Sequence, residues 1–150
     1  GSELAGGIAA KLVYPERQVV VITGDGSLLM SSSDFVTAVE AAANILVVVL
    51  NDSRYGMITA MQLMRFGRSL GDKIGTINFA RFAQSFGAAG VRIESFGKLT
   101  ETIEQALALN RRTPVILDAV CSNELHGNYS VIVRKLRNMQ KTFQKNVFDI

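Results

Sequence analysis

The residues best placed to do chemistry lie in two acidic turns, each of which follows an apolar run. Gly24-Asp25-Gly26-Ser27 follows the run Val19–Ile22, and Asn51-Asp52 follows the run Ile45–Leu50. Short apolar runs rich in β-branched residues are typical of buried strands, and a helix-like segment follows each turn. We therefore expect the two aspartates at the carboxyl ends of adjacent parallel strands, where open α/β sheets bind their ligands.

Carboxylates in such a crevice favour a divalent metal over a bare phosphate. Gly24 and Gly26 would let the backbone turn tightly and approach a ligand closely, and Ser27 offers a hydroxyl and an amide. The next helix is expected to start near Tyr55-Gly56-Met57, where the amides and the helix dipole favour an anion. A diphosphate there would repel both aspartates unless a cation lay between them, and Mg²⁺ or Ca²⁺ accepts carboxylate, carbonyl and phosphate oxygens.

The rest of the chain alternates helix-like and strand-like segments. We expect helices over 3–13, from an N-cap at Ser31 to about 43, over 55–64, 78–86 and 98–109, and strands over 18–23, 45–51, 91–93 and 115–120. A glycine-containing loop over 65–76 reads as mobile. This alternation predicts an α/β fold: a doubly wound, mostly parallel sheet with helices on both faces.

Composition limits the class of protein. At 150 residues the chain reads as a single domain, 1–150, and its 48% hydrophobic content is typical of a globular protein. The longest apolar run is far too short to span a membrane. The lone Cys121 excludes an internal disulfide, fits a reducing cytoplasmic compartment, and is expected to be a small buried hydrophobe.

Basic residues gather near the end of the chain and account for much of the formal net charge of +3. They are Arg134, Lys135, Arg137, Lys141 and Lys145. Nucleic-acid binding is one reading of this tail, but a solvated helix face is the more common cause of such a run. We therefore expect a helical tail over 123–150, with neither nucleic acid nor membrane as a partner.

Two other phosphate-binding motifs fit poorly. The Walker loop, with its Gly-Lys-Ser/Thr ending, is absent. The dinucleotide fingerprint G-x-G-x-x-G fails at its third position, where Leu29 stands, and Asp52 comes too late to hold the ribose. A nicotinamide-dependent oxidoreductase is therefore the weaker alternative.

The spacing of the two turns resembles the thiamine diphosphate signature, in which Gly-Asp-Gly is followed by Asn-Asn or Asn-Asp. The neighbouring segments Lys11–Val20, Leu50–Met57 and Phe79–Ala88 agree with it. Together they look like the C-terminal, diphosphate-binding domain of the acetolactate synthase and pyruvate oxidase group, over about residues 4–122. The fold implied is the thiamine diphosphate-binding fold.

The resemblance implies a role for each site residue. Asp25 and Asp52 would bind Mg²⁺ through their carboxylates, and Arg54 through its backbone carbonyl. The remaining residues would contact the diphosphate: Gly24, Gly26 and Ser27 along its length, and the amides of Tyr55, Gly56 and Met57 at the terminal phosphate. Asp52 departs from the more common asparagine, which adds a negative charge at the metal.

The resemblance also implies what lies outside this chain. In the family an activating glutamate sits on a separate pyrimidine-binding domain, usually of the partner subunit, and nothing in this sequence resembles that domain. We therefore expect a fragment or a separately encoded subunit, inactive alone. The whole enzyme would be a homo-oligomer that decarboxylates a small 2-oxo acid and passes the product to an acceptor. A non-catalytic cofactor-binding module is the alternative.

Overall fold

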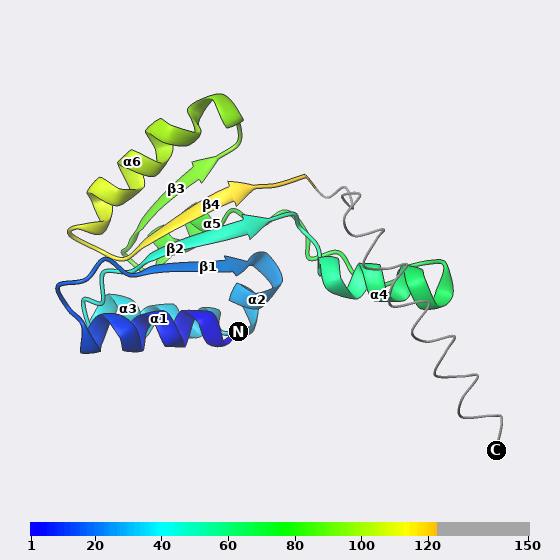
Figure 1. Cartoon of the computed structure of the whole chain (residues 1–150), viewed down its shortest axis with the longest axis horizontal. Coiled ribbons are helices and arrows are strands. Elements are labelled where there is room, and N and C mark those ends of the chain that lie inside the picture. The colour runs from blue at the N-terminus through cyan, green and yellow to red at the C-terminus, as the bar shows by residue number, and fades with distance from the viewer. Residues whose placement is uncertain (123–150) are drawn as a thin grey trace, which may run out of the picture. The chain divides into compact units, whose positions relative to one another are not determined.

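The computed structural model describes residues 1–122, so the predicted helical tail and its basic residues lie outside the described part. The described residues fall into two compact units: Gly1–Ser53 with Ile74–Cys121, which holds the sheet, and Arg54–Lys73 (Figure 1). Each unit is described by itself. In residues 1–122 no helix has the length and apolar character needed to cross a membrane.

The first unit is built on a four-stranded sheet in the order β1-β2-β4-β3, and every neighbouring pair is parallel. Its strands are β1 (Val20–Gly24), β2 (Leu46–Asn51), β3 (Ala89–Ile93) and β4 (Val115–Val120). The predicted parallel α/β class is confirmed. β1 pairs with β2 from Val20 opposite Leu46 to Gly24 opposite Leu50, so both strands end at the same edge of the sheet.

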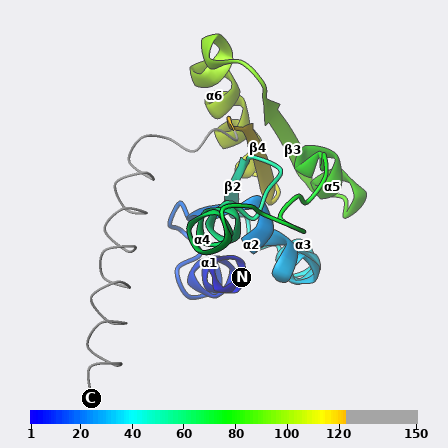
Figure 2. The ribbon, with the colours of Figure 1, turned by 90° about the vertical axis from the view of Figure 1, so that its right-hand side faces the viewer.

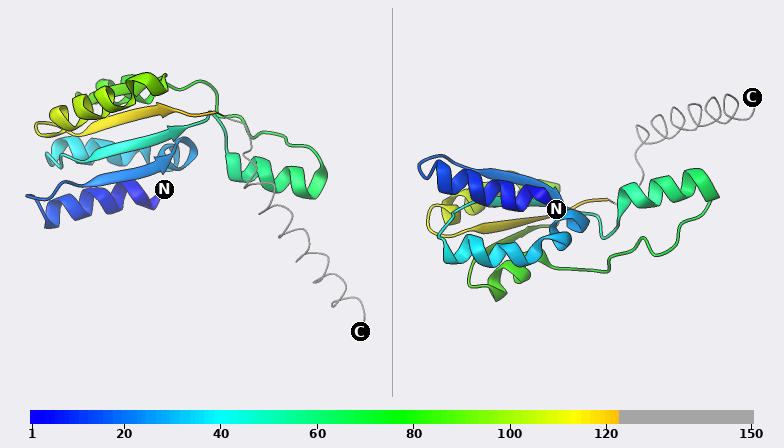
Figure 3. Two further views of the ribbon diagram at one scale, coloured as in Figure 1. Left: turned by 45° about the horizontal axis from the view of Figure 1, so that its top comes forward. Right: turned by 90° about the horizontal axis from the view of Figure 1, so that it is seen from below.

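Helices cover both faces of this sheet. α1 (Ser2–Val13), α3 (Phe35–Glu40) and α5 (Phe79–Ser85) pack on one face, and α6 (Leu99–Asn110) packs on the other (Figures 2 and 3). Successive strand residues point to opposite faces, so Val47 joins the first core and Leu46 the second. The α6 side leaves β1 uncovered: Val20 is 48% exposed and Ile22 65%.

The segment after β1 differs from its prediction. α2 (Asp25–Met30) begins directly after β1, a short 3-10 helix follows at Ser32–Asp34, and α3 ends at Glu40. Ser31 occupies the N-cap position of this 3-10 helix, but its side chain makes no capping hydrogen bond. Gly24 has a φ of −86°, and Gly26 is not among the glycines with positive φ. Neither glycine therefore adopts the left-handed backbone conformation, and α2 begins directly at the end of β1.

The second unit contains α4 (Gly56–Phe66), which confirms the helix expected there. The chain after α4 folds back on the start of the helix: the Asp72 carbonyl accepts from the Tyr55 amide at 2.9 Å, and the backbones of Arg54 and Lys73 form an isolated antiparallel β-bridge. Thr59 Oγ1 also donates to Asp72 Oδ2 at 2.7 Å. Hydrogen bonds from Thr59 and Ser69 lower the pKa of Asp72, so the predicted loop is tied to α4 by an ionised carboxylate.

Candidate metal–diphosphate site

Asp25 is a buried carboxylate at the carboxyl end of β1. It is the first residue of α2, where the helix dipole favours a negative charge, and it is only 3% exposed. Its Oδ1 accepts the Gly26 amide at 2.7 Å. A Cβ on Gly24 would meet nothing within 4 Å, so the backbone beside this carboxylate has room for a ligand.

Asp52 directly follows β2 and is half-buried. Ser53 then takes a left-handed φ of +59°, which turns the chain sharply after the carboxylate. Because Gly24 pairs with Leu50 in the parallel register, Asp25 and Asp52 leave adjacent strands at the same edge of the sheet. The predicted arrangement of two acids at the ends of neighbouring parallel strands is therefore present.

The chemistry of these donors fits Mg²⁺ held together with a phosphate. Mg²⁺ is usually bound by one or two carboxylates plus substrate phosphates, rather than by an all-protein cage. Among residues 1–122, no group of three or more His, Cys, Asp or Glu side chains could hold a metal ion. Two carboxylates therefore leave coordination positions for backbone carbonyls, water or diphosphate oxygens.

Four predicted site residues belong to the second unit: Arg54, Tyr55, Gly56 and Met57. The Tyr55 amide donates to the Asp72 carbonyl, so it is already used within the chain and the phosphate role predicted for that amide is not supported. Gly56 and Met57 are the first two residues of α4. Their diphosphate contacts, and the metal contact of the Arg54 carbonyl, stay predictions.

Sequence reasoning missed a charged residue beside this site. Asp118 lies inside β4 and is fully buried, and its Oδ1 accepts from Asn51 Nδ2 at 2.9 Å. The sequence could have revealed Asp118, because it is an acidic residue within the apolar run 115–120. Aspartate is almost never fully buried unless it is paired, so a partner is expected for it.

Cys121 is exposed, so its expected role as a buried hydrophobe is wrong. It follows β4, and its amide donates to the Asn51 carbonyl at 2.8 Å. The thiol pKa is raised first by partial burial of the sulfur and further by the negative charges of Asp52, Asp25 and Asp118. The pKa of the Cys121 thiol therefore depends on the charges of both candidate metal ligands, Asp25 and Asp52.

This coupling predicts how fast Cys121 reacts. Because the raised pKa keeps the thiol protonated, we expect its alkylation by iodoacetamide near pH 8 to be slower than that of an unperturbed thiol. Asp25→Asn and Asp52→Asn should each lower the pKa and speed the reaction, while Glu40→Gln on α3 should not. The measurement is the pH–rate profile of this single cysteine, and profiles unchanged in both aspartate variants would contradict it.

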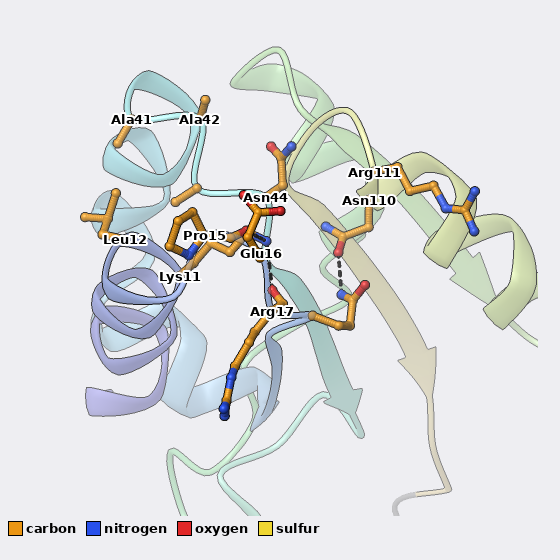
Figure 4. Close-up of a pocket in the computed structure, with 12 residues that line it drawn as sticks. Lys11, Leu12, Pro15, Glu16, Arg17, Ala41, Ala42, Asn44, Asn110 and Arg111 are labelled. Atoms are coloured by element: carbon orange, nitrogen blue, oxygen red, sulfur yellow. Dashed lines mark hydrogen bonds between the residues drawn. The ribbon is translucent and has the colours of Figure 1, made fainter.

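A hollow of about 560 Å³ lies at the other end of the sheet (Figure 4). Lys11 on its rim donates to the carbonyls of Pro15 and Arg17, and Gln18 Nε2 donates to Asn110 Oδ1 at 2.7 Å. These residues precede or flank the amino ends of the strands. Parallel sheets bind ligands at the carboxyl ends, so this hollow is separate from the candidate site.

The all-parallel sheet and the paired carboxylates define an α/β ligand-binding domain whose site lies at the carboxyl ends of its strands. Comparison with known families identifies the family to which this domain belongs. Residues 1–119 match the profile of the thiamine pyrophosphate enzyme, C-terminal TPP binding domain, and the chain belongs to this family. The resemblance seen in the sequence is confirmed.

Individual relatives agree. Acetolactate synthase from Bacillus subtilis (strain 168) is 39% identical over 118 residues, covering 79% of this chain and 20% of that protein. Pyruvate oxidase from Lactiplantibacillus plantarum is 33% identical over 125 residues, covering 83% and 21%. The chain thus spans about a fifth of the length of these relatives.

A solved structure shares the fold. The thiamine diphosphate-dependent 4-hydroxybenzoylformate decarboxylase from Rhodococcus jostii RHA1 superposes with a TM-score of 0.72 at 23% identity. The match covers 80% of this chain and 23% of the decarboxylase chain. At this identity the likeness supports the fold.

Proposed function

We propose that this chain binds Mg²⁺ and the diphosphate of thiamine diphosphate, as part of a 2-oxo acid decarboxylating or carboligating enzyme of the acetolactate synthase type. The observation that carries the proposal is the pair of carboxylates, Asp25 and Asp52, at the ends of adjacent parallel strands in a TPP-binding family. Family membership removes the ground for the nicotinamide alternative.

In this proposal the chain anchors the cofactor. When bound, thiamine diphosphate supplies the bond-breaking chemistry of 2-oxo acid decarboxylation. Asp25 and Asp52 would hold the cation that neutralises the diphosphate, and Gly24, Gly26 and Ser27 would contact the diphosphate oxygens.

Catalysis would need a second component. We propose a pyrimidine-binding domain, on a longer chain or a separate subunit, within a cytoplasmic homo-oligomer. Adding such a domain to this chain and assaying CO₂ release from pyruvate separates an enzyme component from a non-catalytic binding module. Release that depends on both chains supports the enzyme, and no release despite cofactor binding supports the module.

The binding proposal is tested by calorimetry on the 150-residue chain. Thiamine diphosphate should bind in the presence of Mg²⁺ and not in EDTA, and inorganic diphosphate should compete for the same site. Equal binding with and without Mg²⁺, or no binding at all, would overturn the proposal.

The extra charge of Asp52 gives a sharper prediction. Asp52→Asn should still bind thiamine diphosphate, but it should need more Mg²⁺, because one negative charge at the cation is lost. Two unit charges about 4 Å apart attract by about 1 kcal/mol in water, and Mg²⁺ carries two charges, so we expect the half-saturating Mg²⁺ concentration to rise by at least about 30-fold. The two Mg²⁺ titrations decide, and superimposable curves would show that the charge plays no part.

A further inference from the structure

A buried hydrogen-bond network lies behind the candidate metal ligands, with Asp118 at its centre. Asp118 is 0% exposed. Its Oδ1 accepts from Asn51 Nδ2 at 2.9 Å, and its Oδ2 accepts from the Phe79 amide at 2.9 Å and from the Arg92 guanidinium. One carboxylate thus joins the end of β2, the start of α5 and the carboxyl-terminal part of β3.

The network holds Asn51 from several sides. Asn51 is 4% exposed, and its Nδ2 donates both to Asp118 and to the Ile77 carbonyl, at 3.0 Å in the second case. Its Oδ1 accepts from Ser53 Oγ at 3.4 Å. Asn51 and Ser53 are the two neighbours of Asp52 in the chain, so this network fixes the backbone on both sides of that carboxylate.

Neither Asp118 nor Asn51 has to touch the metal to affect it. A ligating carboxylate binds well only when its orientation is fixed, and partners outside the coordination sphere supply that orientation. We infer that Asp118 is a positioning residue of the metal site: through Asn51 it holds the end of β2 in the conformation that presents Asp52. This inference rests on the proposed Mg²⁺ site.

Removal of the Asp118 charge should be felt at Asp52. Asp118→Asn keeps the size of the side chain but cannot accept from all three donors, so the hold on Asn51 weakens. Loss of an outer partner of a metal ligand typically lowers metal affinity about 10–100-fold. We expect an effect of that size on Mg²⁺ affinity in the presence of thiamine diphosphate.

The test compares variants of the 150-residue chain by calorimetric Mg²⁺ titration with thiamine diphosphate present. Asn51→Ala breaks the same link from the other side and serves if Asp118→Asn does not fold. The double variant should bind Mg²⁺ about as weakly as the weaker of the two single variants, because the effects of substitutions within one network do not add. Additive losses, or unchanged affinity in both single variants, would overturn the inference.

Asn110→Ala is the matched control. Asn110 is also a buried amide, 3% exposed, but it bonds to Gln18 and Thr113 at the amino ends of the strands. It should lower the melting temperature and leave Mg²⁺ affinity within about twofold. An equal loss of affinity in this control would mean that stability alone explains the effect.

Hydrogen exchange in the metal-free chain separates this inference from the proposed function. Asp118→Asn and Asn51→Ala should speed exchange of the Asp52 and Ser53 amides, and Asn110→Ala should not. If the parent chain fails to bind Mg²⁺, the proposed function falls and this exchange pattern decides the positioning role. Unchanged exchange in both variants would overturn it.

Discussion

Asp25→Asn is expected to abolish Mg²⁺-dependent binding of thiamine diphosphate while leaving the fold intact. The asparagine side chain keeps the oxygen that accepts the Gly26 amide but loses the charge that attracts the cation. Outer partners of metal ligands contribute about 10–100-fold in affinity, so loss of a direct ligand should cost at least that much. Because Asp25 is buried, the neutral side chain should not lower stability.

Two measurements check this expectation: a calorimetric titration with Mg²⁺ and thiamine diphosphate, and thermal unfolding without ligand. Glu40→Gln on α3 removes the same charge from an exposed position and should change neither. Mg²⁺-dependent binding that survives in a folded Asp25→Asn chain would show that residues other than Asp25 hold the metal.

The largest expected loss of stability comes from Gly90→Ala in β3. A Cβ at Gly90 would lie 1.9 Å from the Ala80 carbonyl oxygen and 2.6 Å from the Ala80 Cα, so it would meet the backbone of α5. Overpacking typically costs about 1–3 kcal/mol, and a helix backbone cannot rotate away as a side chain can. We expect a loss at the upper end of that range or above it.

Gly6→Ala is the matched control for this variant. Gly6 lies within α1, and a Cβ there would meet nothing within 4 Å. The same substitution should raise stability by up to about 1 kcal/mol, because alanine favours the helix. Urea unfolding gives both values, and a Gly90→Ala chain as stable as the parent would mean that α5 moves away at little cost.

Features set by local pattern could be predicted from the sequence. Apolar β-branched runs marked β1, β2 and β4, and parallel strands end together, so the neighbouring positions of Asp25 and Asp52 followed from chain order. Asn78 also caps α5 at the start of the helix expected over 78–86, accepting the Arg81 amide at 2.9 Å. In each case the signal and its structural consequence lie close together in the sequence.

Features set by contacts between residues far apart in the chain could not be predicted from the sequence. The pairing of Asp118 with Asn51 joins residues far apart in the chain, and the Tyr55 amide is used by Asp72 across a loop. The exposure of Cys121 depends on which elements surround the end of β4. Residue type and spacing carry no record of such partners, so they appear only once the sheet is assembled.

The position of β1 at the edge of the sheet has a practical consequence for experiments on this chain. Within residues 1–122 its outer edge pairs with no strand, and Val20 and Ile22 are exposed beside it. An open, apolar edge is a template for edge-to-edge aggregation between molecules. Ligand titrations therefore call for dilute protein and a light-scattering check, since self-association would otherwise be mistaken for cofactor binding.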